Sequence, residues 1–290
     1  MPRYKLTIEY DGGPFVGWQM QDSGRSVQGQ IMAAVALIQA CVRYKANILI
    51  SGGTGSGKTT LLNILGSRIP GTQRLLVIED SSELKIRTDH VVFFETRHPD
   101  ETGKGGVGMR DLLRSALRLR PDRIVLGEVR GPEALDLVTA MNTGHGGSMG
   151  TLHANTPYDA LVRLETLAMM GDTQVPVGAI RRQIATAVHL VVQIRRFNDG
   201  SRKVTHITEV IPDVDEHGRY LLRDLFVFIQ RGRTRDGKIL GEIVPTGALP
   251  SFLQEIELNR LPFGIVVFAE SGRVLLANAA GDALPLVQFY

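Results

Sequence analysis

The stretch Gly52-Gly53-Thr54-Gly55-Ser56-Gly57-Lys58-Thr59 decides the fold of this chain, because it fits the phosphate-loop pattern G-x-x-x-x-G-K-[ST] in full. An apolar run at residues 47–51 precedes it and is typical of a buried strand, and a helical run follows at residues 60–65. The glycines allow successive backbone N–H groups to face a polyphosphate, and the helix N-terminus adds a positive partial charge at the same place. The sequence therefore predicts a strand, a phosphate loop and a helix in succession.

Two side chains of this loop have distinct expected roles. Lys58 would reach the β- and γ-phosphates of a nucleotide, and the hydroxyl of Thr59 would ligate Mg²⁺. The other expected nucleotide contacts come from neighbouring small residues: Gly52, Gly53, Thr54, Gly55, Ser56, Gly57 and Thr60. We therefore expect ATP and Mg²⁺ as the bound species.

Composition limits the class of protein. The chain has 290 residues with 43% hydrophobic content, which is enough for one large domain or two modest ones. No apolar run approaches the ~20 residues of a membrane span, and the first residues lack the apolar core of a signal peptide, so we expect a cytoplasmic protein. The single cysteine, Cys41, excludes an intramolecular disulfide and a multi-cysteine zinc site. A net charge of +3 is too small to indicate a nucleic-acid partner, and none is expected.

The order of apolar runs predicts an α/β fold with a mainly parallel sheet and an antiparallel β extension. Up to about residue 190, strands are expected at 48–51, 74–79, 91–95, 123–127 and 148–152. Between them, helices are expected at 58–67, 109–120, 132–142, 157–170 and 177–188. Beyond this point, strands at 189–196, 204–210, 220–228 and 238–244 are separated by turns such as Asn198-Asp199-Gly200, which favours antiparallel pairing.

Two acidic clusters stand at the ends of predicted strands. Hydrolysis of a nucleotide needs carboxylates to organise Mg²⁺ and the attacking water. Glu79 and Asp80 end one strand at the edge where open α/β sheets bind ligands. Glu128 ends another strand, with Gly127 in the place of the usual metal-side Asp, so part of the acidic support for Mg²⁺ must come from Glu79 and Asp80. The alternative is that these carboxylates are helix caps or solvated strand ends.

A segment rich in small residues, 143–153, ends in His153 after a predicted strand. This placement could bring an imidazole near the γ-phosphate as a sensor of its presence. The alternative is a structural histidine with satisfied hydrogen bonds. Zinc binding by His145 and His153 is disfavoured, since no cysteine pairs with them.

These clusters together resemble a known family. Residues 38–256 are similar to the RecA-like ATPase domain of the type II/type IV secretion superfamily, most closely the CpaF-like ATPases of tight-adherence pilus assembly. The resemblance rests on the Walker A run 52–59, an "Asp box" at 78–80, an atypical Walker B at 127–131 and a "His box" at 143–153. It implies a Mg²⁺-dependent ATPase that forms a ring, expected to be a hexamer. In that family Glu128 would activate water, Glu79 would support it and the metal, and His153 would lie near the γ-phosphate.

The resemblance also implies a cellular role. The motor would drive pilin extrusion or protein secretion from the cytoplasmic face of the inner membrane, held there by platform proteins. Members of this family carry a sizeable N-terminal domain that closes over the nucleotide, whereas about 46 residues precede the core here. An alternative function is therefore a nucleotide-binding module without efficient turnover.

The two ends resemble other families. Residues 3–31 are similar to the start of TruA-type tRNA pseudouridine synthases, which makes an RNA-modifying protein a remote alternative. That alternative lacks its catalytic Asp, because no segment like Gly-Arg-Thr-Asp-Ala-Gly-Val-His occurs in the chain. Residues 260–282 resemble the opening hairpin of a PAS domain. We therefore expect three parts: an N-terminal segment at 1–37, the ATPase domain at 38–256 and a C-terminal fragment at 257–290.

Overall fold

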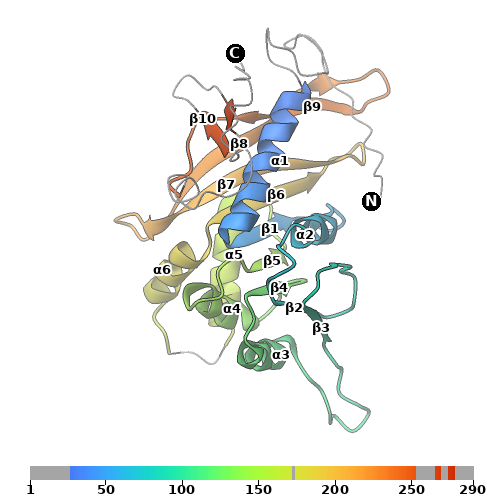
Figure 1. The fold of residues 1–290 in the computed structure, drawn as a ribbon, viewed down its shortest axis with the longest axis vertical. Coiled ribbons are helices and arrows are strands. Elements are labelled where there is room, and N and C mark those ends of the chain that lie inside the picture. The colour runs from blue at the N-terminus through green and yellow to red at the C-terminus, as the bar shows by residue number, and fades with distance from the viewer. Residues whose placement is uncertain (1–26, 172–173, 253–264, 269–273, 278–290) are drawn as a thin grey trace.

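The computed structural model describes residues 27–171, 174–252, 265–268 and 274–277. Their centre is a nine-stranded sheet in the order β3-β2-β4-β5-β1-β6-β7-β8-β9 (Figure 1). The parallel part contains β1 (Ile48–Gly52), β2 (Leu75–Glu79), β3 (Val91–Glu95), β4 (Arg123–Leu126), β5 (Met149–Leu152) and β6 (Leu190–Arg196). The antiparallel part adds β7 (Arg202–Val214), β8 (Tyr220–Arg233) and β9 (Ile239–Pro245).

Helices cover both faces of this sheet. One face carries α1 (Val27–Tyr44) and α2 (Lys58–Gly66), and the other carries α3 (Met109–Ala116), α4 (Glu133–Asn142), α5 (Pro157–Met169) and α6 (Val177–Ala187) (Figure 1). A short 3-10 helix, η1 (Leu117–Leu119), extends α3. Because side chains alternate along a strand, Ile48 and Ile50 pack with α1 and α2 whereas Leu49 packs on the opposite face. Burial on both faces explains why the central strands read as continuous apolar runs.

The expected strands and helices between residues 48 and 188 are confirmed to within a few residues. One finding differs from the expected division of the sheet: β6 does not belong to the antiparallel extension alone. It pairs in parallel with β1 on one side and antiparallel with β7 on the other. The crossover through α6 returns the chain to the same edge as the other crossover helices, which aligns β6 with β1.

Helix α1 was not expected from the sequence. It runs across the predicted boundary between residues 37 and 38, and Leu37, Cys41 and Val42 on it are buried in the core. The division into 1–37, 38–256 and 257–290 stays a prediction. Residues 1–26 lie outside the described residues. Within the C-terminal part, β10 (Ile265–Phe268) and β11 (Val274–Ala277) form an antiparallel pair.

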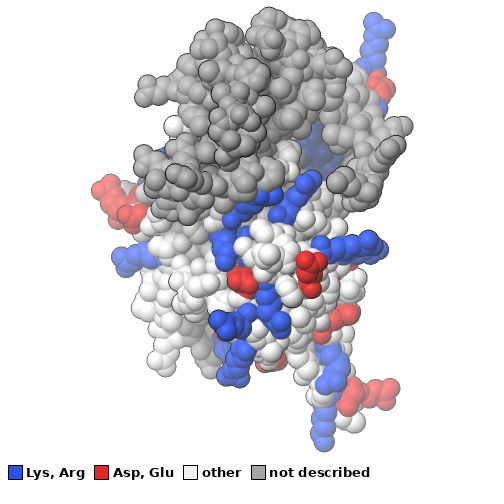
Figure 2. Space-filling model, in the orientation of Figure 1, with Lys and Arg blue, Asp and Glu red and all other residues white. Residues whose placement is uncertain are grey.

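The surface carries charges of both signs. On the face seen in Figure 2, lysine and arginine side chains gather near the middle of the molecule, with acidic side chains between and below them. On the face of the sheet opposite α1 and α2, Arg110 and Arg114 of α3 both form ion pairs with Asp136 of α4 and so join these two helices. No helix among the described residues is both long and apolar enough to cross a membrane.

The start of β1 is fixed by a fully buried side chain, Asn47. Its Nδ2 donates to the carbonyl of Ala187 at 2.6 Å, and its Oδ1 accepts from the backbone N–H groups of Gly147 at 2.7 Å and Ser148 at 3.1 Å. Its own backbone N–H donates to Nδ1 of His189 at 3.1 Å. One amide therefore joins the starts of β1, β5 and β6 at the amino edge of the sheet.

We expect Asn47→Ala to lower the free energy of unfolding by about 3 kcal/mol or more, because several buried backbone groups would lose their partner at once. The matched control is Asn142→Ala, since Asn142 is exposed and donates one hydrogen bond, to the carbonyl of Gln183 at 2.9 Å. Its loss should cost about 1 kcal/mol or less. Urea unfolding of both variants measures the difference, and equal losses would contradict the role given to Asn47.

Candidate functional site

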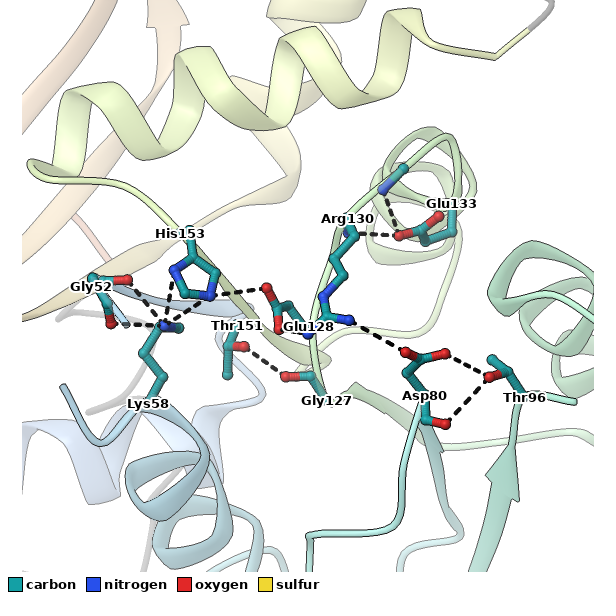
Figure 3. A network of polar contacts seen from close by, with 12 residues as sticks. Gly52, Lys58, Asp80, Thr96, Gly127, Glu128, Arg130, Glu133, Thr151 and His153 are labelled. Atoms are coloured by element: carbon teal, nitrogen blue, oxygen red, sulfur yellow. Dashed lines mark hydrogen bonds and ion pairs between the residues drawn. The ribbon is translucent and has the colours of Figure 1, made fainter. Parts of the chain in front are cut away.

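Four neighbouring parallel strands end at one edge of the sheet, and the predicted site residues lie there. The strands β2, β4, β5 and β1 are adjacent in that order. Glu79 ends β2, Glu128 follows β4, His153 follows β5 and the phosphate loop follows β1. The structure thus brings together clusters that are up to about a hundred residues apart in the sequence (Figure 3).

The phosphate loop has the backbone conformation that its glycines predict. Gly55 and Gly57 have φ angles of 67° and 99°, in the left-handed region that favours glycine. Gly52 must lack a side chain, because a Cβ there would lie 2.4 Å from the backbone oxygen of Ile194. Helix α2 begins directly after this loop, at Lys58. Its N-terminus and the loop amides therefore form the kind of site that binds anions.

The ammonium of Lys58 lies at the mouth of the loop. It donates to the backbone carbonyls of Gly52 and Gly53, both at 3.0 Å (Figure 3). The ring nitrogens of His153 are 3.4 and 3.5 Å away. Burial lowers the pKa of Lys58, and the nearby carboxylate of Glu128 opposes part of this shift. The amine is therefore held close to the expected phosphate position by the loop itself.

Glu128 has a partner at each carboxylate oxygen. Its Oε1 lies 3.0 Å from Nε2 of His153, and its Oε2 accepts a hydrogen bond from Nη2 of Arg130 at 2.6 Å (Figure 3). The pKa of His153 is lowered, first by burial and then by the positive charge of Lys58, so the ring is neutral at neutral pH. A neutral imidazole beside Glu128 leaves the negative charge of this carboxylate in place.

Arg130 joins the two acidic clusters and was named from the sequence only as part of the Walker B stretch. Its Nη1 lies 3.3 Å from Oδ2 of Asp80, whose Oδ1 accepts from the hydroxyl of Thr96 at 2.6 Å. The hydrogen bond to Glu128 raises the pKa of Arg130. The backbone N–H of Arg130 donates to Glu133 at 2.7 Å, which fixes the segment that carries it. An arginine two residues after a strand-end glutamate was the available sequence signal.

The side chain of Glu79 lies close against position 127. Its carboxylate is buried and accepts from the backbone N–H groups of Glu83 at 3.1 Å and Leu84 at 3.0 Å. A Cβ at Gly127 would lie 3.0 Å from Cγ of Glu79. Burial raises the pKa of Glu79, and the two backbone hydrogen bonds partly oppose this. Glu79 on β2 therefore leaves little space for a side chain at position 127, just after β4.

The oxygen atoms at this edge suit Mg²⁺. Thr59, Glu79, Asp80 and Glu128 line a cavity of about 90 Å³ together with Ser81, Glu83, Gly127 and Arg130. Across the residues that the structure describes, no three His, Cys, Asp or Glu side chains gather to hold a metal by themselves. Magnesium is usually bound through one or two carboxylates together with water and substrate phosphates, so this donor set fits an ion shared with a nucleotide. Both oxygens of Asp80 accept hydrogen bonds, from Thr96 and Arg130, whereas the two hydrogen bonds to Glu79 both end at its Oε1.

A family profile decides the relationship. The profile of the Type II/IV secretion system protein family matches residues 27–220 of the 290. The chain belongs to this family. Membership confirms the predicted secretion superfamily. The finer resemblances, to CpaF-like ATPases, TruA-type synthases and PAS domains, stay predictions.

Curated relatives of the family match the same core. A candidate conjugal transfer protein of Mycobacterium tuberculosis is 42% identical over 175 residues, which cover 60% of this chain and 49% of that protein. The type IV secretion system protein VirB11 of Bartonella quintana is 38% identical over 176 residues, with coverages of 60% and 49%. The chain thus spans about half the length of the curated relatives it matches.

A solved member of the family shares the fold. The crystal structure of the VirB11 ATPase from the Brucella suis type IV secretion system, in complex with sulphate, is 33% identical with a TM-score of 0.55. The match covers 61% of this chain and 52% of that one. The predicted α/β class, a RecA-like core with a mainly parallel sheet and an antiparallel extension, is thereby confirmed. The roles given to Thr59, Glu79, Asp80, Glu128 and His153 stay predictions.

The close contact between Glu79 and position 127 can be tested by a double-mutant cycle. We expect Gly127→Ala to lower the free energy of unfolding by about 1 kcal/mol, because the added Cβ would press on the buried side chain of Glu79. In a Glu79→Ala background the same change should cost less, since the clashing Cγ is gone. Gly178→Ala is the control, because a Cβ there meets no atom within 4 Å. Equal costs of Gly127→Ala in both backgrounds would show that the two side chains do not compete for space.

Proposed function

We propose that this chain is a Mg²⁺-dependent ATPase that powers a type II/IV secretion machine. The observation that carries the proposal is the convergence of Lys58, Glu128 and Glu79 at one sheet edge beside the phosphate loop. Family membership and the VirB11 ATPase among the related structures support it. The proposed reaction is hydrolysis of the terminal phosphoanhydride bond of ATP to ADP and phosphate.

In this proposal each side chain has one task. The loop amides and the ammonium of Lys58 bind the β- and γ-phosphates. Glu128 orients the attacking water and accepts its proton as the oxygen bonds to the γ-phosphorus, while His153 holds Glu128 in position. Thr59 and Glu79, with Asp80 behind them, would hold Mg²⁺, which neutralises phosphate charge when bound. ADP leaves with the electron pair of the broken bond.

We also propose that copies of the chain assemble into a ring, expected to be a hexamer. In the cell this ring would act at the cytoplasmic face of the inner membrane through platform proteins. No nucleic-acid partner is expected. Membership of the secretion family supports this setting. Native mass measurement with and without ATP tests the ring: the mass of one chain, 31.8 kDa, under both conditions would rule it out.

Lys58→Ala should weaken ATP binding by about tenfold or more, because the phosphate cradle loses its fixed cation and a charge-assisted hydrogen bond. Isothermal calorimetry with Mg²⁺ and ATP measures this. Lys85→Ala is the control, since Lys85 is exposed and its backbone N–H donates to Asn63 of α2 rather than to the phosphate loop. If the parent and Lys58→Ala bind equally well, the phosphate loop is not the nucleotide site.

Glu128→Gln should retain ATP affinity within about twofold and lose at least about 100-fold in turnover, because an amide of the same shape cannot accept a proton. Phosphate release beside calorimetry separates the two effects. His153→Gln should reduce turnover less, since it acts on Glu128 rather than on water. If the parent binds ATP and releases no phosphate, the chain is a nucleotide-binding module without turnover, and the assignment of Glu128 fails.

A further inference from the structure

Four positive side chains pair across the β6–β7 hairpin. Arg195 lies opposite Lys203, and Arg196 lies opposite Arg202. Like charges directly opposite each other in an antiparallel pair destabilise a sheet. Each pair therefore needs a partner that compensates its charge.

The first pair has such partners on its own side of the hairpin. The guanidinium of Arg195 lies 5.1 Å from the ring centre of Phe197, and the ammonium of Lys203 lies 5.5 Å from that of Phe228. Cation–π contacts at these distances are favourable. Aromatic rings thus account for Arg195 and Lys203.

The second pair, on the other face of the hairpin, faces the phosphate loop. Nε of Arg202 donates a hydrogen bond to the backbone carbonyl of Gly55 at 2.8 Å, across 147 residues of sequence. A Cβ at Gly55 would lie 3.4 Å from Nη1 of Arg196. Among the described residues, neither arginine forms an ion pair with a carboxylate. The charges of this pair are therefore directed at the loop.

The hydrogen bond from Arg202 fixes one peptide group of the loop. In a planar trans peptide the C=O and N–H groups point in opposite directions. With the Gly55 carbonyl turned to Arg202, the N–H of Ser56 points the other way and donates to the carbonyl of Gly53 at 3.4 Å. Gly55 itself restrains this peptide little, because glycine adopts positive and negative φ with similar ease. The orientation of this peptide, in the middle of the phosphate loop, thus depends on Arg202.

We propose that Arg202 is a positioning residue of the phosphate loop and that Arg196 beside it adds positive potential for the bound polyphosphate. This inference rests on the proposed function, since it requires ATP in the loop. Arg202 acts through the Gly55–Ser56 peptide, and its effect is on the affinity for phosphates rather than on the chemical step. Arg196 acts through its charge alone.

The test compares charge removal on the two faces of one hairpin. Arg202→Ala should raise the Kd for ATP and the KM about threefold to tenfold, the value of one lost hydrogen bond, while kcat stays within about twofold. Arg202→Lys retains the charge but cannot donate from the Nε position, so it should recover only part of the affinity. Arg196→Ala should raise the Kd about twofold at low salt, and less at high salt because the effect is electrostatic.

Arg195→Ala and Lys203→Ala are the matched controls, since each removes one positive charge from the same hairpin on its aromatic face. Both should bind ATP like the parent. Faster hydrogen exchange of the Ser56 amide in Arg202→Ala, with no change in the controls, would support the positioning role. If Arg202→Ala binds ATP as the controls do, or if its amide exchange is unchanged, the proposal is wrong. Failure of the parent to bind ATP would instead refute the proposed function.

Discussion

The hydrogen bonds of Asn47 set the register on which the site depends. Strand β1 has five residues, so the position of its first residue determines where the phosphate loop begins at its other end. The buried amide holds that first position against the starts of β5 and β6. A shift of one residue would turn every side chain of β1 to the opposite face and move the loop away from the ends of β4 and β5. The side chains at the carboxyl edge are therefore positioned by hydrogen bonds at the amino edge.

Charges at the carboxyl edge alternate along one continuous chain of contacts. In this chain each side chain lies within hydrogen-bonding or ion-pair distance of the next, in the order Thr96, Asp80, Arg130, Glu128, His153 and Lys58. Each carboxylate thus has a cation beside it, and the neutral ring of His153 separates Glu128 from Lys58. Arg130 and Asp80 are 62% and 46% exposed, so this part of the network lies at the surface of the edge. The network also links β2, β4, β5 and the loop, so no one of these side chains is placed independently.

Local signals in the sequence were sufficient for the phosphate loop and most of the parallel core. The loop has a fixed spacing of glycines and lysine, and the central strands are apolar on both faces, so both were predictable without knowledge of tertiary contacts. Helix α1 was missed because its sequence has apolar residues on several sides and no acidic residue in its first turn. The sequence showed that Gly127 stands where an Asp is usual. The close approach of Glu79 to this position was not predictable, because it depends on the pairing of β2 with β4. The contacts of Arg130, Arg196 and Arg202 were not predicted, since their partners depend on how the strands are placed side by side and not on sequence spacing.

The phosphate loop and the antiparallel extension are parts of one unit, and β6 is the reason. This strand pairs with β1 as far as Gly52 and continues into the hairpin that carries Arg196 and Arg202. The backbone oxygen of Ile194 is so close to Gly52 that any side chain there would collide with it. The loop is therefore confined by β6 at its first residue and by the guanidinium of Arg202 at Gly55. Because a paired strand moves as a body, a displacement of the loop that breaks neither contact must also displace β6 and β7. The extension is thus connected directly to the backbone of the phosphate loop through β6 and Arg202.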